Sequence, residues 1–178
     1  MSDKVFNNMR VYLGAIKNMH EINKLYCWIN DKELVNLSSS FTPIHFSSHL
    51  EWFNNIRQDK SCVLFGIRKI CNNELIGSCQ LHSINHIYKK AELQIRFGLD
   101  NVSKGYGKEA LFLLINYGFN DLNLNKIYLH VFDTNHRAIS LYKSLGFTQE
   151  GILRDDAYIC GKYVDVLVMS ILRREWIK

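Results

Sequence analysis

The sequence has few of the features that mark a membrane, secreted or repetitive protein. It contains one proline, Pro43, in 178 residues, and it has no apolar run long enough to span a bilayer. Residues 1–13 lack the pattern of a signal peptide, and no repeats or low-complexity tracts occur. These absences predict a cytoplasmic protein that does not insert into a membrane.

The cysteines also lack paired metal-ligand spacing. The five cysteines are odd in number and scattered, which favours reduced thiols over a disulfide framework. His45 and His49 have the (i, i+4) spacing of a metal pair, but no convincing third ligand accompanies them. We therefore predict no metal site, and we expect the histidines to be exposed or to cap a helix.

The net charge of the chain excludes few classes of function. A net charge of +5 is modest, and the lysines are spread rather than gathered in a run, so nucleic-acid binding is not predicted. The excess of positive charge is compatible with acidic small ligands. With 47% apolar residues, the chain suits a single domain over residues 1–178 with a substantial core.

Hydrophobic periodicity predicts alternating strands and helices. We expect strands at residues 10–16, 62–70, 75–82, 91–97, 127–131, from Phe147 onward, and at 164–172. We expect helices at residues 20–30, from a cap at Ser47 or Ser48 through residue 56, from the glycine segment at 101–110 to Gly118, and from a cap at Asn135 to Gly146. Residues 71–74 are expected to form a hairpin turn, and 154–162 a turn-rich excursion. Helical crossovers combined with hairpins predict a mixed α/β sheet flanked by helices.

Residues 101–110 follow a strand-like run and open the most helical segment. Gly105 and Gly107 leave backbone uncovered where the helix begins, and Lys104 and Lys108 add positive charge. Because the first amides of a helix have no acceptor within the helix, phosphate oxygens are natural partners for them. A Gly-x-Gly pattern also suits a flexible loop before a helix, and that alternative stays open.

Several short motifs resemble, in their order, the GCN5-related N-acetyltransferase (GNAT) superfamily. They are AELQ at 91–94, GYG at 105–107, LNKI at 124–127, NHRA at 135–138, LY at 141–142 and LGF at 145–147. The chain is most similar to the branch of ribosomal-protein, spermidine and amino-sugar-nucleotide acetyltransferases. The resemblance implies a mixed sheet of about seven strands with about four flanking helices. It also implies transfer of an acetyl group from acetyl-CoA to a primary amine by direct attack in a ternary complex.

The resemblance further implies a phosphate loop for coenzyme A. Its pyrophosphate would be bound, mainly through backbone amides, by Lys104, Gly105, Tyr106, Gly107 and Lys108. Val102 stands where the family has Gln or Arg, and Ser103 where glycine is common. Since the amides remain, we expect these departures to weaken the site and not to abolish it.

Other cofactor contacts follow from the same resemblance. The strand before the loop would offer free backbone groups of Ile95, Arg96 and Phe97 to the pantetheine arm, because the family splays this strand from the next one. Asn135 resembles the asparagine that holds the cofactor arm, although a simple helix cap is an alternative role.

Acetyl transfer needs a neutral amine, stabilisation of an oxyanion and a proton for the departing thiolate. Tyr142 matches the general acid of the family, and a phenol with a pKa of about 10 is protonated at neutral pH. A plain core tyrosine is the alternative. Glu92 resembles the family glutamate that takes the proton of the amine, or that only holds a cationic amine, and both interpretations stay open.

The acceptor is the least determined feature. Residues 28–31 and 49–52 resemble amino-sugar-nucleotide acetyltransferases, whereas 88–94 and 126–131 look equally like spermidine acetyltransferases. A polycation needs several carboxylates, and few occur between residues 20 and 56. We therefore predict an amino-sugar nucleotide, received between residues 38–46 and the edge that carries Glu92.

Other functions stay open at this stage. A polyamine and a protein N-terminus are alternative acceptors. An inert acyl-CoA sensor on the same fold would be a different class of protein; the missing Gln or Arg at Val102 favours it, and Tyr142 and Glu92 oppose it. The sequence also leaves a homodimer open.

Overall fold

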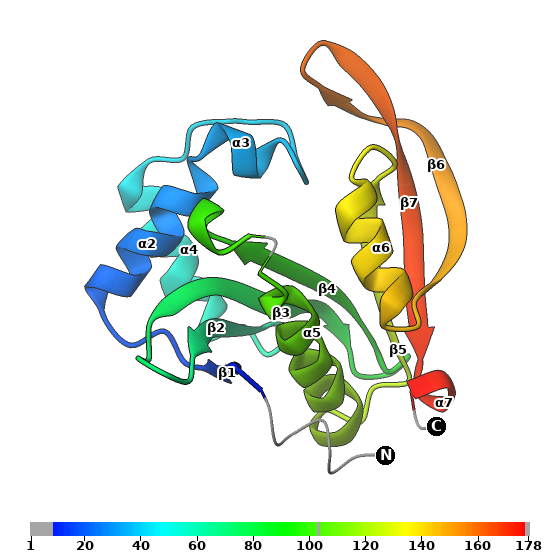
Figure 1. Ribbon diagram of the computed structural model, residues 1–178, viewed down its shortest axis with the longest axis horizontal. Coiled ribbons are helices and arrows are strands. Elements are labelled where there is room, and N and C mark those ends of the chain that lie inside the picture. The colour runs from blue at the N-terminus through cyan, green and yellow to red at the C-terminus, as the bar shows by residue number, and fades with distance from the viewer. Residues whose placement is uncertain (1–8, 103, 177–178) are drawn as a thin grey trace.

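The structure, a computed structural model, describes residues 9–102 and 104–176, so Ser103 lies outside the described residues. Seven strands form one mixed sheet in the order β1-β2-β3-β4-β5-β7-β6 (Figure 1). The strands are β1 (Val11–Gly14), β2 (Val63–Lys69), β3 (Leu75–Asn85), β4 (Lys90–Phe97), β5 (Lys126–Phe132), β6 (Thr148–Ile159) and β7 (Lys162–Leu172). The helices within the described residues are α2 (Met19–Ile29), α3 (Lys32–Val35), α4 (Phe46–Ile56), α5 (Tyr106–Asn116), α6 (His136–Ser144) and α7 (Arg173–Trp176). The predicted mixed sheet of seven strands is confirmed.

The sheet has two parts that differ in how they pair. Strands β1 to β4 are antiparallel neighbours, and β5, β7 and β6 form a second antiparallel group. The predicted hairpin between β2 and β3 is present, and Asn73 takes a φ of 59°, the left-handed conformation that asparagine tolerates. The only parallel pairing within the described residues joins β4 to β5.

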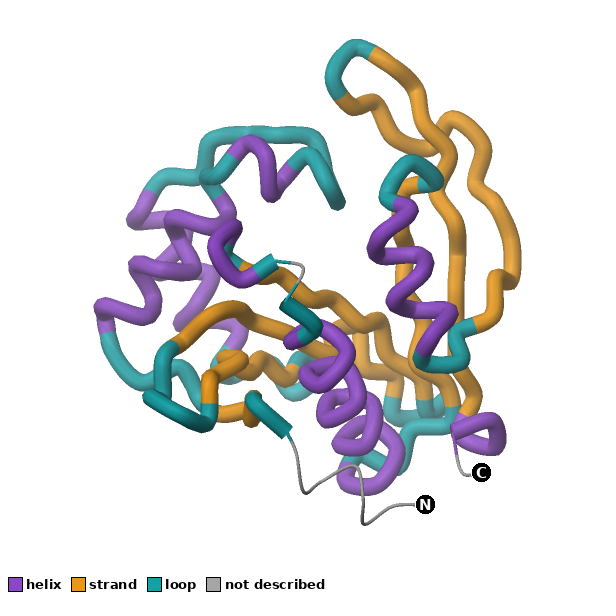
Figure 2. Tube along the Cα trace, viewed as in Figure 1, coloured by secondary structure: helices purple, strands orange, loops and turns teal. Residues whose placement is uncertain are grey.

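That parallel pairing is short. Lys90, Ala91 and Glu92 lie opposite Lys126, Ile127 and Tyr128. Beyond Glu92 the two strands diverge, although β4 continues to Phe97 and β5 to Phe132. Figures 1 and 2 show the resulting opening between the half that carries β4 and the half that carries α6, β5 and β7. The splayed strand implied by the family resemblance is therefore confirmed.

Helices cover both faces of the sheet. Side chains of β4 alternate, so Ala91 and Leu93 join the buried core that includes Leu111 and Leu114 of α5. On the opposite face, Gln94 and Arg96 lie beneath α2 and α4. In the second half, α6 contributes Ile139 and Tyr142 to the same core, and Leu145, directly after the helix, joins them.

A buried ion pair ties α2 to β2. The Arg68 Nη2 donates to Glu21 Oε2 at 2.6 Å and to the carbonyl of Ala15 at 3.0 Å, and Arg68 is 1% exposed. Burial raises the pKa of Glu21, but hydrogen bonds from Arg68 and from the Lys17 amide outweigh burial and leave this pKa below 4.5. Glu21 therefore stays ionised at neutral pH.

Two of the predicted helix boundaries are confirmed, and one is wrong. The Asn135 side chain accepts from the amide of Ala138 and so caps α6, and Gly146 follows the end of α6 with a φ of 94°. Helix α4, however, begins at Phe46 after His45 without a side-chain cap, so the predicted cap at Ser47 or Ser48 is wrong. The first turn of α4 takes in both serines.

The short helix α3 was not predicted, and the two predicted C-terminal strands are longer than expected. Asp31 accepts from the amides of Glu33 and Leu34 and starts α3, which is only four residues long. The turn-rich excursion expected at residues 154–162 is wrong, because β6 continues to Ile159 and the chain reverses at Cys160–Gly161, both with positive φ. β6 is exposed along most of its length and shifts register twice, so it lacks the alternation by which a strand is recognised.

Candidate active site

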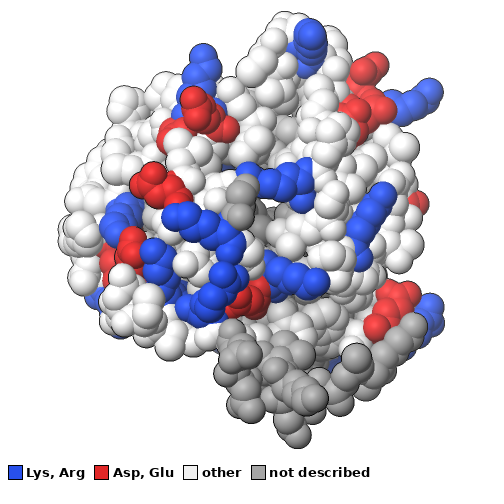
Figure 3. Space-filling model, in the orientation of Figure 1, with Lys and Arg blue, Asp and Glu red and all other residues white. Residues whose placement is uncertain are grey.

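The opening between the two halves of the sheet contains a cleft of about 300 Å³. All nine predicted cofactor residues line it, and so does Tyr142. The nine are Ile95, Arg96, Phe97, Lys104, Gly105, Tyr106, Gly107, Lys108 and Asn135. Figure 3 shows lysine and arginine side chains around the hollow at the centre of this face, and those that line the cleft are Arg96, Lys104, Lys108 and Arg137. The cleft therefore combines an apolar floor with a basic rim.

The start of α5 is built for close approach to its backbone. Gly105 has a φ of 83°, a left-handed conformation that suits glycine, and it precedes α5 without a side-chain cap. A Cβ atom at Gly105 would lie 2.9 Å from Arg10 Nη2. The first amides of α5 thus face the cleft mouth without a competing side chain, which suits phosphate oxygens.

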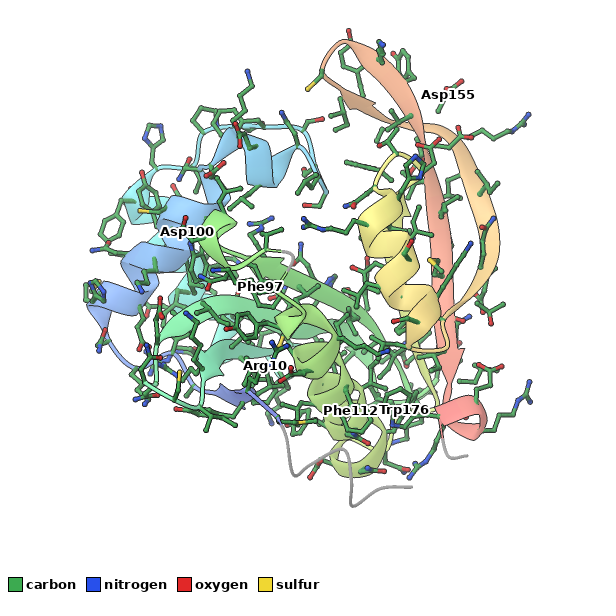
Figure 4. The ribbon with its side chains drawn as sticks, in the orientation of Figure 1. Arg10, Phe97, Asp100, Phe112, Asp155 and Trp176 are labelled. Carbon is green, nitrogen blue, oxygen red and sulfur yellow. The ribbon has the colours of Figure 1, made fainter. Side chains whose placement is uncertain are left out.

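Arg10 is a charged neighbour of this loop that the sequence did not reveal. Its guanidinium lies 4.8 Å from the centre of the Tyr106 ring, and its Nε donates to Glu109 Oε1 at 2.7 Å (Figure 4). The backbone amide of Arg10 donates to Glu109 Oε2 at 2.6 Å. Glu109 thus holds Arg10 against the first turn of α5. The guanidinium lies beside the loop in which Val102 replaces the Gln or Arg of the family pattern.

The edge of β4 that faces the opening has free backbone. Ile95, Arg96 and Phe97 pair with β3 on their other side. In the described part of the chain, no strand pairs with their β5 side, because the β4–β5 register ends at Glu92. An amide-rich, extended ligand could use this edge as a further strand would.

The loop after α3 reaches across the opening. Leu37 and Ser38 line the cleft, and the Leu37 carbonyl accepts from Asn135 Nδ2 at 3.1 Å. Further out, the Ser40 hydroxyl donates to the Tyr158 carbonyl at 2.7 Å. Figure 2 shows this loop running from α3 toward the β6–β7 hairpin. The loop therefore partly roofs the cleft, which suits its predicted place beside the acceptor.

Tyr142 lies on α6 with its side chain directed into the core and the cleft. It is 8% exposed, and its ring centre lies 5.7 Å from that of Phe147. Burial raises the pKa of Tyr142 to about 12. No residue in the described ranges forms a hydrogen bond with its hydroxyl. The phenol is therefore protonated at neutral pH and free to donate.

Glu92 lies deeper than the cleft lining, at the last paired position of β4. Its Oε1 is 2.8 Å from His130 Nδ1, and it also forms a hydrogen bond with Tyr128. Burial raises the pKa of Tyr128, and the charge and hydrogen bond of Glu92 add to that rise. Of the described residues, His130 lines the cleft and Glu92 does not. The sequence placed Glu92 correctly on the polar face but gave no sign of His130.

A second, smaller cavity of about 70 Å³ lies beneath α2 and α4. Its wall includes Trp28, His49, Trp52 and Arg96. His49 is 1% exposed, with Nε2 3.2 Å from the Ile22 carbonyl and no partner for Nδ1 among the described residues. The expectation that His49 is exposed or caps a helix is therefore wrong, because the Trp52 ring and the turn of α2 that carries Ile22 enclose it.

Arg96 is the unusual charge of this region. It lines both the main cleft and the smaller cavity. Burial lowers its pKa, yet within residues 9–102 and 104–176 it forms no hydrogen bond or ion pair. A guanidinium without a partner in such a place is suited to an anionic or oxygen-rich ligand group.

The described residues contain no group of three or more His, Cys, Asp or Glu side chains that could hold a metal ion. None of their helices has the length and hydrophobicity needed to cross a bilayer.

Comparisons with known proteins match most of the chain. A family model described as an acetyltransferase (GNAT) domain matches residues 17–168. The spermidine N(1)-acetyltransferase of Vibrio cholerae is 40% identical over 164 residues, which cover 92% of this chain and 91% of that protein. The protein of the same name from Escherichia coli K12 is 37% identical over 107 residues, or 60% of this chain and 58% of its own length. The crystal structure of the Vibrio cholerae spermidine N-acetyltransferase with CoA and spermine superposes with a TM-score of 0.91, at 29% identity, over 96% of this chain and 100% of that one.

Proposed function

Because the chain belongs to the GNAT superfamily and is an acetyl-CoA-dependent N-acetyltransferase, we propose that its acceptor is a polyamine of the spermidine class. The observation that carries this proposal is the similarity, over nearly the whole chain, to an enzyme named for spermidine. A close structural neighbour binds CoA and spermine together. These findings favour the polyamine alternative over the amino-sugar nucleotide that the early helices had suggested.

Features of the cleft itself, independent of the comparison with relatives, suit coenzyme A. The uncapped start of α5 after the left-handed Gly105, together with the basic side chains Lys104 and Lys108, suits a pyrophosphate. The free edge of Ile95 to Phe97 suits the amides of a pantetheine arm. When bound, acetyl-CoA supplies the thioester whose acetyl group is transferred.

We assign Tyr142 the role of proton donor to the departing sulfur. Its phenol lines the cleft, is protonated at neutral pH, and has no described hydrogen-bond partner to hold the proton back. Asn135 caps α6 and binds the Leu37 carbonyl, so it fixes the helix that carries Tyr142 as well as lining the cleft. Asn135 is thus a helix cap that also lines the cleft, and its predicted role of holding the cofactor arm stays a prediction.

The test of the acceptor is a panel assay. Purified protein is given acetyl-CoA and, separately, spermidine, spermine, an amino-sugar nucleotide and a short peptide, and thiol release is followed. We expect the fastest turnover with spermidine or spermine. Turnover of the amino-sugar nucleotide without turnover of either polyamine would refute the polyamine proposal. Binding of acetyl-CoA without thiol release for any amine would support the inert sensor.

One observation favours the amino-sugar nucleotide as a second candidate. The unpartnered guanidinium of Arg96, in a cavity walled by Trp28 and Trp52, would repel a polycation and attract a diphosphate. Arg96→Gln should then raise the KM for the nucleotide about tenfold or more and leave or lower the KM for spermidine. Arg154→Gln, at an exposed position of β6, is the matched control.

Other features stay predictions. These are the cytoplasmic location, the single-domain organisation over residues 1–178 and the homodimer. A protein N-terminus also stays an alternative acceptor, and the peptide in the panel tests it.

A further inference from the structure

We propose that His130, and not Glu92, takes the proton of the acceptor ammonium, and that Glu92 positions His130 for this step. The proposal rests on the N-acetyltransferase activity and does not depend on which amine is accepted. The sequence had offered Glu92 either as the base or as a holder of the amine. The geometry places a different group between Glu92 and the cleft.

The divergence of β4 and β5 determines where Glu92 and His130 lie relative to the cleft. Glu92 and Tyr128 form the last register pair of β4 and β5, so Glu92 sits at the apex of the opening. His130 follows two residues after Tyr128 along β5, on the same face of the strand, where β4 has already moved away. The His130 side chain is 39% exposed and lines the cleft together with Tyr142. Glu92, with 23% of its side chain exposed, does not line the cleft but contacts His130, which does.

The hydrogen bond from His130 determines which ring nitrogen is free. An ionised carboxylate only accepts hydrogen bonds, so the 2.8 Å contact is donated by His130 Nδ1–H to Glu92 Oε1. In the neutral ring this leaves Nε2 with the lone pair, and Nε2 is then the basic atom. The Tyr128 hydroxyl, which also bonds to Glu92, fixes the carboxylate from a second side. When Nε2 gains a proton, the negative charge of Glu92 lies directly against the imidazolium.

The proton transfers balance. His130 Nε2 takes one proton from the acceptor ammonium, which leaves a neutral nitrogen with a lone pair. That nitrogen bonds to the acetyl carbon while the carbon–sulfur bond breaks, and Tyr142 gives one proton to the sulfur. The second proton lost by the nitrogen restores the Tyr142 phenol through water. The sum is an amide, a thiol and one proton, which His130 returns to the solvent.

The experiment compares two substitutions that keep side-chain shape. His130→Gln removes the base, and Glu92→Gln removes the charge that orients it. Each variant is assayed with the fastest acceptor of the panel, and acetyl-CoA affinity is measured by calorimetry. His20→Gln, at an exposed position of α2, is the matched control. Because His130 is partly exposed, we expect the variant to fold, and His130→Asn serves as a second test of the same position.

We expect His130→Gln to lower kcat by about 100-fold or more, the usual scale for a lost proton acceptor, with acceptor KM and acetyl-CoA affinity unchanged. Glu92→Gln should lower kcat less, by about tenfold, and the double variant should be no slower than His130→Gln alone, because Glu92 acts through His130. A loss confined to acceptor KM in His130→Gln would overturn the proposal. So would a larger kcat loss in Glu92→Gln than in either His130 variant.

Discussion

Replacement of Tyr142 by phenylalanine removes one oxygen atom from the cleft and tests whether that oxygen donates a proton. The ring packs against Phe147 at 5.7 Å between centres, and phenylalanine retains this contact. Since no described residue bonds to the hydroxyl, its removal leaves no buried partner unsatisfied. We therefore expect the free energy of unfolding to change by less than about 0.5 kcal/mol, which is a shift of under about 2 °C in Tm for a chain of this size.

The expected effect on the reaction is far larger. Loss of a general acid costs about 10² to 10⁴ in rate, which corresponds to about 2.7 to 5.4 kcal/mol in the activation barrier. The acid works in its protonated form, so its contribution is present below its pKa and is lost as the pH rises through that value. Because burial raises the pKa of Tyr142 to about 12, its ionisation should not lower kcat anywhere up to pH 10.

The assay follows thiol release at saturating acetyl-CoA and acceptor, with a pre-steady-state measurement to establish that the chemical step limits turnover. Calorimetry checks that Tyr142→Phe binds acetyl-CoA as the parent does. An unchanged kcat, with chemistry limiting, would refute the role of proton donor. A fall in parent kcat between pH 9 and 10 that disappears in Tyr142→Phe would refute the pKa argument.

Three further predictions test the loop and the fold. Gly107→Trp should abolish acetyl-CoA binding in a folded protein, because even a Cβ there lies 3.2 Å from Leu141 Cδ2, and calorimetry that finds full affinity would contradict the assigned site. Lys104→Ala should weaken acetyl-CoA binding more at 20 mM than at 500 mM salt, since salt screens an exposed charge, and equal losses would argue against a charge contact. Arg68→Met should destabilise the protein by about 3–5 kcal/mol by stranding buried Glu21. The bonds from Arg68 hold the pKa of Glu21 below 4.5, and burial raises it once they are removed, so the destabilisation measured by denaturant should be complete at neutral pH and should shrink as the pH falls toward and through the lower folded value.

The sequence was most informative where a local rule governs the chain. The alternation at residues 91–97, the glycines before α5, and the cap and terminator of α6 each act within a few residues, so their patterns are visible in one dimension. The family resemblance that these patterns carry named nine residues that the structure brings together in one cleft, and their binding of the cofactor stays a prediction.

The features that escaped prediction depend on distant neighbours. Arg10 meets Glu109 across 99 positions, and His130 meets Glu92 across 38. His49 is buried because other elements close over it, which its own spacing does not reveal. β6 has both faces largely exposed, so it carries no alternating pattern. Each of these four features is explained by the residues that surround it in the fold, but the periodicity of the sequence does not indicate it.

If acetyl-CoA lies along the opening between β4 and β5, as proposed, its binding also stabilises the fold. Among the described residues three pairs join β4 to β5, and the shared core and the contacts of the loop after α3 also hold the two half-sheets together. A ligand that lies along the opening favours the folded chain by mass action, by about 2.7 kcal/mol at one hundred times its dissociation constant. For a chain of this size that corresponds to about 5 to 10 °C in Tm. Starvation for the acetyl donor would then shorten the lifetime of the enzyme in a cell as well as slow its reaction.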